Sequence, residues 1–299
     1  MQRVAIFGGV SLDRTVYLDT TELPPVGTVF SSGARDQVGS TGAGKALNLA
    51  RLGFDVYLHA QVGHDTAGQY IRSFFAGQPV RADFYADPAG SETHVNLVDR
   101  AGQRISIYTA YTTFDPQVEP ETLTAVIQQA DYVVLNIMNY VRRLIPVARS
   151  AGKKIWCDVH DYDGQSAYHQ DFIAAADYLF CSADRLADPE AFMRQQIDSG
   201  KQLVVCTRGR HGASALDSAG NTVDAGIVAG YDVVDTNGAG DAFFAGFLYG
   251  YDKGADLGTC MKYAAIAGGL CVASPELYNA SLTPALIEAE FSQRGLRTR

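Results

Sequence analysis

Residues 233–250 read VVDTNGAGDAFFAGFLYG, in which a glycine-rich turn leads into an apolar helical run. The small residues Gly238, Ala239 and Gly240 let backbone N–H groups approach an anion closely, and the positive end of a helix dipole favours negative charge there. Asp241 would then stand where it can accept a proton from an attacking hydroxyl. The plainer interpretation is a turn whose aspartate caps a core helix. The stretch alone leaves both interpretations open.

Outward from this stretch, short apolar runs alternate with longer helical patterns. The runs lie at residues 3–8, 56–62, 132–137, 154–158, 177–181 and 202–207, and the helical patterns at residues 66–76, 119–130, 140–151, 186–199 and, as two consecutive helices, 238–273. This alternation predicts an α/β fold with a doubly wound, largely parallel sheet flanked by helices. Ligands of such sheets bind beyond the carboxyl ends of the strands, which directs attention to the loops after Phe7, Val62, Asp158 and Thr207.

Two segments depart from this alternation of apolar runs and helical patterns. Residues 10–18 and 93–109 alternate polar with apolar side chains, and the second contains a turn at residues 99–102. This pattern is typical of antiparallel strands with one solvated face. A small β-sheet of this kind is either a lid that excludes water or an edge hairpin without that role.

Composition limits the classes of function. The chain has 299 residues, 47% of them hydrophobic, and a net charge of −9, which argues against a nucleic-acid-binding surface. Its five cysteines show no CxxC spacing, so we expect reduced thiols and a cytoplasmic protein. The sequence contains no signal-peptide pattern and no apolar run long enough to span a membrane, and we expect a small-molecule substrate.

Residues 39–46 read GSTGAGKA, close to the P-loop pattern GxxxxGK[ST]. Ala46 stands where a P-loop has its Mg²⁺-binding hydroxyl, and residues 30–38 are polar and broken where a buried strand is required. The nucleotide-binding P-loop interpretation is therefore disfavoured.

Taken together with the glycines that follow it, the same segment resembles the first signature of the ribokinase-like (PfkB) carbohydrate kinases. Residues 238–241 resemble the second signature of that family. The first signature is carried by Gly39, Gly42, Ala46, Gly53 and Gly63, and the other similar elements are Gly8, Gly9 and Asp13, the run Val62-Gly63-His64-Asp65 with Gly68, and residues 207–213, TRGRHGA. The resemblance spans roughly residues 3 to 250 in the family's order.

This resemblance implies a single domain over residues 1–299, with a β-sheet lid formed by about residues 10–38 and 91–112. It implies transfer of the γ-phosphoryl group of ATP, with Mg²⁺, to a hydroxyl of a small sugar. By the family's pattern Asp241 is the catalytic base, and the N–H groups of Gly238, Ala239 and Gly240 form an anion hole.

Further residues take roles only through the resemblance. It implies sugar binding at Asp13, Gly39, Ser40, Thr41, Gly44 and Lys45, ATP binding at Ser182, Thr207, Gly209, Gly212 and Asn237, adenine contacts near residues 264–268, and a monovalent cation such as K⁺ at Asp235 and Thr236. Asp158 and His160, which follow a strand, are expected to face the same site. The plain alternatives are a solvated turn for Asp13 and a local cap at residues 235–236.

The chain departs from the family pattern where substrate and metal are held. Ser40 replaces a glycine, Gly44 replaces an asparagine that contacts the substrate, and the N-x-x-E element is missing around Ser182. The acceptor is thus expected to be a ketose or pentose type of sugar, without an identified hydroxyl. Two alternatives remain: a nucleoside kinase with Tyr108 and Tyr111 lining a slot for the base, and a non-catalytic binding relative. Exposed lid edges also make a homodimer through the lid an expectation.

Overall fold

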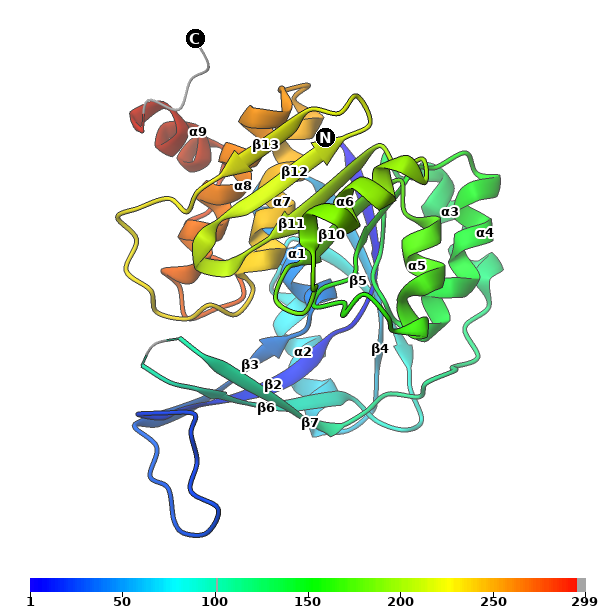
Figure 1. Ribbon diagram of the computed structural model, residues 1–299. Coiled ribbons are helices and arrows are strands. Elements are labelled where there is room, and N and C mark those ends of the chain that lie inside the picture. The colour runs from blue at the N-terminus through cyan, green and yellow to red at the C-terminus, as the bar shows by residue number, and fades with distance from the viewer. Residues whose placement is uncertain (101, 295–299) are drawn as a thin grey trace.

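The computed structural model describes residues 1–100 and 102–294. Strands in these residues form a nine-stranded sheet and a separate four-stranded sheet (Figure 1). The large sheet has the order β13-β12-β11-β10-β9-β8-β1-β4-β5. Its strands are β1 (Arg3–Phe7), β4 (Asp55–Val62), β5 (Val80–Ala86), β8 (Tyr132–Leu135), β9 (Ile155–Asp158), β10 (Tyr178–Ser182), β11 (Leu203–Thr207), β12 (Ala213–Asp217) and β13 (Thr222–Ala225).

Neighbouring strands pair in parallel along the part of the sheet with the order β11-β10-β9-β8-β1-β4-β5. Strands β12 and β13 pair in antiparallel fashion at one edge. The central strands β8 and β9 are short and almost completely buried, as expected where helices cover both faces of a sheet. The prediction of a doubly wound, largely parallel sheet is therefore confirmed.

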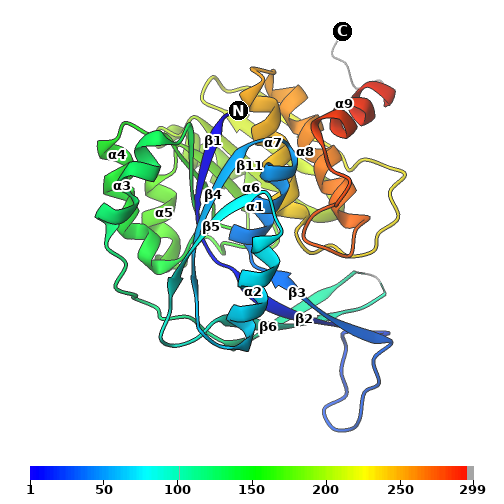
Figure 2. The ribbon, with the colours of Figure 1, turned by 180° about the vertical axis from the view of Figure 1, so that it is seen from behind.

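Helices cover both faces of this sheet (Figure 2). They are α1 (Thr41–Arg51), α2 (Thr66–Ala76), α3 (Pro120–Gln129), α4 (Leu144–Ser150), α5 (Gln170–Ala175), α6 (Pro189–Asp198), α7 (Ala239–Asp252), α8 (Leu257–Val272) and α9 (Pro284–Gln293). Successive β1 side chains point to opposite faces, so Val4 and Ile6 join the core under α1, α7 and α8, while Ala5 and Phe7 join the core under α3 and α4.

The four-stranded sheet, called the lid below, has the order β3-β2-β6-β7. Its strands are β2 (Ser11–Tyr17), β3 (Gly33–Gly39), β6 (Glu92–Val98) and β7 (Arg104–Ala110). Figures 1 and 2 show it beyond the end of the large sheet at which β1 finishes. One face of β6 is buried and the other half-exposed. The buried face carries the polar residues at positions 92, 94 and 96, whereas the apolar residues Val95 and Leu97 are half-exposed, which is the reverse of the arrangement that the alternating sequence predicts.

Several elements differ from the sequence-based expectation. Residues 33–39, which read as polar and broken, form strand β3, in which only the last three residues are buried. The edge strands β5 and β13 lack continuous apolar runs, because at most one residue of each is buried. Strand β12, which lies between β11 and β13, lacks such a run as well. The pattern at residues 140–151 divides into a 3₁₀ turn over Asn139–Arg143 and helix α4. In the described part of the chain, no helix is both long and apolar enough to cross a membrane.

Candidate active site

The N-terminus of α7 has the geometry of an anion site. Gly238 is the N-cap with φ 80°, and a Cβ there would lie 2.6 Å from the carbonyl oxygen of Leu277, so only glycine fits. The first N–H groups of a helix have no carbonyl partner within it. The Gly240 N–H belongs to this first turn, in a segment without bulky side chains, whereas the Ala239 N–H donates to the Thr236 carbonyl oxygen at 3.3 Å. The turn can therefore bring N–H groups close to a negatively charged ligand.

Asp241 lies in the same first turn and is only 7% exposed. Its Oδ1 lies 2.6 Å from Lys45 Nζ. A Cβ on Gly44 would lie 2.3 Å from Oδ2, so the carboxylate occupies the space that a side chain at position 44 would fill. Burial raises the pKa of Asp241 above its ordinary value, while the Lys45 charge opposes that rise. The carboxylate is thus a buried ion-pair partner whose second oxygen packs against Gly44.

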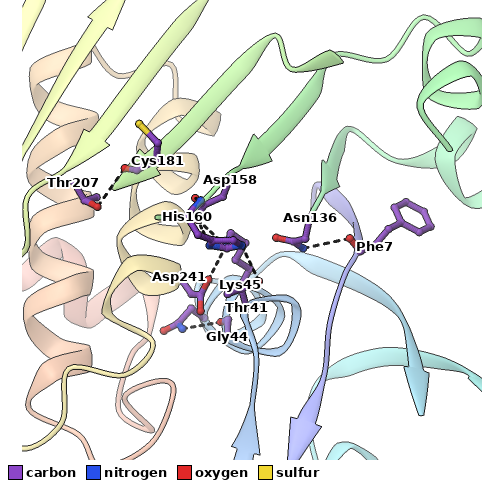
Figure 3. Close-up of polar contacts among 11 residues, drawn as sticks. Phe7, Thr41, Gly44, Lys45, Asn136, Asp158, His160, Cys181, Thr207 and Asp241 are labelled. Carbon is purple, nitrogen blue, oxygen red and sulfur yellow. Dashed lines mark hydrogen bonds and ion pairs between the residues drawn. The ribbon is translucent and has the colours of Figure 1, made fainter. Parts of the chain in front are cut away.

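Lys45 connects this carboxylate to a second one (Figure 3). Its side chain is fully buried, and Nζ lies 3.0 Å from Asp158 Oδ2 at the end of β9. Burial opposes the charge on both groups, but their attraction prevails, raising the pKa of Lys45 and, with His160, holding the pKa of Asp158 well below its usual range. That Lys45 contacts the sugar stays a prediction, and in the structure its ammonium group lies between two aspartates.

The start of α1 brings more polar groups to this point. Thr41 Oγ1 lies 3.4 Å from His160 Nε2, and His160 Nδ1 lies 3.5 Å from Asp158 Oδ2. Ser40, the N-cap of α1, has φ 71°, and His160 has φ 52°, both in the left-handed region that favours glycine. Strained backbone of this kind often occurs at functional sites. Asp158 and His160 thus meet the predicted sugar-binding segment.

Asp13, on β2, lies in a buried polar cluster on one face of the lid, together with residues of the neighbouring strand β6. It is 3% exposed, and its carboxylate accepts hydrogen bonds from Ser11 (2.6 Å) and Asn96 (2.9 Å). His94 Nδ1 lies 3.0 Å from it. A Cβ on Gly39 would lie 2.2 Å from the carboxylate. This burial contradicts the alternative of a solvated turn aspartate.

His94 carries a positive charge within this cluster at neutral pH. Its Nε2 lies 3.2 Å from Glu92 Oε1, on the side opposite Asp13. Burial alone would lower the pKa of His94, but the neighbouring carboxylates of Asp13 and Glu92 raise it to about 9. The residue therefore links two carboxylates at the base of the lid, a role that its isolated position in an alternating strand did not reveal.

The expected ATP-binding residues separate into two groups. Ser182 and Thr207 are register partners at the carboxyl ends of β10 and β11. Gly209 and Gly212 follow with φ 50° and 84°, and a Cβ on Gly212 would lie 2.0 Å from a backbone oxygen. Asn237 lies apart from these four, in the loop before α7, where its side chain accepts a hydrogen bond from Arg104 of the lid.

A pocket of about 390 Å³ lies between the end of β13 and α8. Its lining comprises residues 223–229 together with Gly258, Lys262, Ala265 and Arg294. Only Ala265 belongs to the range of α8 that was expected to border adenine. The β13 segment was missed because residues 222–225 form a half-exposed edge strand without an apolar run.

Asp235 and Thr236 have different surroundings. Asp235 is 1% exposed, its Oδ1 accepts from the Asn237 N–H at 2.8 Å, and its Oδ2 has no hydrogen-bond partner. Burial raises the pKa of this carboxyl group. A buried carboxylate oxygen without a partner fits a cation. The Thr236 hydroxyl instead donates to the carbonyl oxygen of Gly102 in the lid turn at 3.3 Å.

Sequence reasoning also missed Asn136, which follows β8. It is 1% exposed, its Nδ2 donates to the Phe7 carbonyl oxygen at 3.3 Å, and its Oδ1 has no partner. A Cβ on Gly8 would lie 2.4 Å from it. In a parallel sheet, a polar residue directly after a buried strand indicates a candidate binding-site residue. For Asn136 this indication became clear only from the structure, in which β8 lies next to β1.

Comparison with known proteins agrees with this geometry. The model of the pfkB family carbohydrate kinases matches residues 1–284. The acarbose 7(IV)-phosphotransferase of Actinoplanes sp. is 32% identical over 277 residues, covering 91% of this chain and 92% of that protein. A solved microbiome-derived acarbose kinase superposes with a TM-score of 0.88 at 29% identity, covering 98% of this chain and 100% of that one.

At 20% identity, the Arabidopsis thaliana ribokinase solved with ribose and ATP shares the fold, with a TM-score of 0.79 and 97% coverage of both chains. The expected ribokinase-like fold with a small second sheet is thereby confirmed, as is the expected enzyme class. The chain belongs to the pfkB family of carbohydrate kinases.

Proposed function

We propose that the protein transfers the γ-phosphoryl group of ATP to a hydroxyl of a sugar, with Asp241 as the general base. The observation that carries this proposal is the position of the Asp241 carboxylate. It lies in the first turn of α7, next to the glycine-rich N-terminus of that helix, and its Oδ2 packs against Gly44 of the predicted sugar-binding segment. A base and an anion site therefore adjoin each other.

The proposed reaction needs few covalent participants. The acceptor oxygen forms a bond to the γ-phosphorus, the bond from that phosphorus to the bridging oxygen of ADP breaks, and the acceptor proton passes to Asp241. The N–H groups of the α7 turn stabilise negative charge on the transferring group. Lys45 keeps the buried Asp241 ionised, because without it burial would favour the neutral acid.

We propose that Asp13 binds hydroxyl groups of the acceptor and that ATP lies along the carboxyl ends of β10 and β11. The adenine would occupy the pocket between β13 and α8, whose volume of about 390 Å³ lies in the range of small-molecule sites. This arrangement supports the expected single domain over residues 1–299, with the lid covering the acceptor.

Metal ions enter the proposal in two ways. Mg²⁺ supplies charge neutralisation on the triphosphate. Across the described residues no three His, Cys, Asp or Glu side chains gather as a metal site, so Mg²⁺ fits best as an ion that arrives with ATP. The unpartnered Oδ2 of Asp235 supports a monovalent cation such as K⁺ beside the anion site, held by Asp235 and not by the Thr236 hydroxyl.

Two further proposals concern the molecule as a whole. Ile105 and Ile107 of β7 are 44% and 46% exposed, which supports a homodimer through the outer face of the lid. All five cysteines are buried free thiols, as expected in a reducing compartment such as the cytoplasm.

The test replaces the base while keeping its shape. Asp241→Asn is expected to lower kcat by about 10²- to 10⁴-fold, the range for loss of a general base, with ATP affinity by calorimetry nearly unchanged. The matched control is Asp252→Asn at the other end of α7, where the carboxylate accepts a hydrogen bond from Tyr132 at 2.8 Å. Near-normal turnover of Asp241→Asn with any sugar acceptor would rule out the base role. Ligand binding without transfer to any acceptor would favour the non-catalytic alternative.

A further inference from the structure

Two exposed tyrosines lie beside the acceptor region and have no role in the proposed reaction. Tyr108 on β7 is 49% exposed, and Tyr111, just after that strand, is 65% exposed. Their rings are nearly parallel, with an interplanar angle of 10° and centroids 5.7 Å apart. Single exposed apolar residues are common, but a contiguous flat aromatic surface indicates a binding site.

The pair lies on the lid face that carries Asp13. Tyr108 is the register partner of His94, and their ring centroids are 4.0 Å apart. His94 in turn binds Asp13 at 3.0 Å. A register irregularity between β6 and β7 at Thr93 and His94 accompanies this packing, and such irregularities re-aim side chains. The contacts therefore run without interruption from Asp13 through His94 to the two tyrosines.

We propose that Tyr108 and Tyr111 bind a second sugar ring of an oligosaccharide acceptor, next to the ring that Asp13 holds. The inference rests on the proposed sugar kinase activity and names its substrate class. The C–H face of a sugar ring is apolar and carries partial positive charge, which suits the negative face of an aromatic ring. Two rings, those of His94 and Tyr108, lie between Asp13 and Tyr111 in this series of contacts, so we place on Tyr111 a neighbour of the reacting ring and not that ring itself.

The geometry disfavours a purine held between the two tyrosines. A flat base in van der Waals contact with a ring on each side needs the rings about 7 Å apart. The centroids are 5.7 Å apart, so the planes lie no farther apart than that. A ligand can stack on the exposed outer surface of the pair, where a sugar ring needs no partner on its other side.

The relatives support an acceptor of several rings. The activity named for the Actinoplanes relative is phosphoryl transfer to acarbose at a position on its ring IV, and the similar solved structure is called an acarbose kinase. Extending that acceptor class to this chain departs from the sequence-based expectation of a small ketose or pentose.

The test measures kcat and KM for acarbose and maltotetraose on one side, and for glucose, ribose and fructose on the other. Tyr111→Ala is expected to raise KM for the oligosaccharides by about 2- to 12-fold, the equivalent of one aromatic contact, and to leave any monosaccharide KM unchanged. Tyr111→Phe keeps the ring and is expected to behave as the native protein. Tyr111 is the cleaner position because Tyr108 also packs on His94.

Calorimetry of acarbose binding to the native protein and to Tyr111→Ala separates the two proposals, because it does not depend on turnover. Loss of acarbose affinity in Tyr111→Ala, restored in Tyr111→Phe, supports the oligosaccharide site even if phosphoryl transfer fails. Transfer to monosaccharides together with no effect of Tyr111→Ala on any oligosaccharide overturns the site and leaves the kinase proposal intact. A preference for adenosine that Tyr111→Ala abolishes also overturns it, because the pair would then bind a base.

Discussion

Replacing Lys45 by Met tests whether this buried lysine holds the active site together. Methionine keeps most of the length and apolar volume but removes the charge that lies 2.6 Å from Asp241 and 3.0 Å from Asp158. Two buried carboxylates would then face each other without a counter-charge. Removing one partner of a buried ion pair costs about 3–5 kcal/mol. That is a large part of a total stability of about 5–15 kcal/mol.

The assay is urea unfolding at pH 7 combined with the pH dependence of kcat/KM. We expect Lys45→Met to lose about 3–5 kcal/mol of unfolding free energy. We also expect its acid limb of kcat/KM to move to higher pH, because the Lys45 charge lowers the pKa of Asp241 and its loss lets burial raise that pKa further. The double variant Lys45→Met/Asp158→Asn removes one carboxylate charge and should recover part of the stability.

Lys201→Met provides the matched control. Lys201 is also buried, at 4% exposed, but its ammonium group donates to the carbonyl oxygens of Ile173 and Ala176 and not to a carboxylate. This variant should lose stability without moving the pH profile. The reasoning about Lys45 is refuted if Lys45→Met unfolds within 1 kcal/mol of the native protein, roughly the error of such comparisons, and keeps its acid limb at the native pH.

Two further predictions concern neighbouring groups. Gly44→Ala should lower kcat severely while changing ATP affinity little, because the new Cβ would lie 2.3 Å from Asp241 Oδ2 and displace the carboxylate. Gly77→Ala, with no neighbour closer than 3.6 Å, is the control, and normal turnover of Gly44→Ala would show that the close packing of Asp241 on Gly44 is not needed. The pKa of His94 is raised to about 9, so its stabilising contribution is complete below its unfolded pKa of about 6.5 and is lost as the pH rises through 9. Urea unfolding between pH 6 and 10 should show this loss in the native protein and a flatter curve in His94→Gln, and identical slopes would contradict the charge state assigned to His94.

Much of the fold follows from local sequence patterns. Apolar runs identify strands that are buried on both faces, such as β8 and β9, because such strands have no polar face to interrupt the run. The same rule explains why β3 and β13 were missed, since only the last three residues of β3 and no residue of β13 are buried. The sequence also predicted the glycine-rich turn before α7, where Gly238 has a positive φ and no space for a side chain.

Only part of the candidate site could be predicted from the sequence. Asp241 and Asp13 were identified through the family resemblance, but their partners were not. Lys45 lies 196 positions from Asp241 in sequence, and no local pattern connects them. His94 and Tyr108 occupy ordinary positions in alternating strands, and only the pairing of β6 with β7 makes them neighbours.

The succession of strands and helices, the glycine-rich turn before α7 and the kind of chemistry that such a turn can support all follow from local sequence, because they depend on residues close together in the chain. The charge balance at the site depends instead on the three-dimensional arrangement. Parallel strands end at one edge of the sheet, so β9 delivers Asp158 to the point where α1 delivers Lys45 and α7 delivers Asp241. Whether a carboxylate is ionised depends on burial and on charges within a few ångströms, and those are set by distances in space and not by distances along the chain.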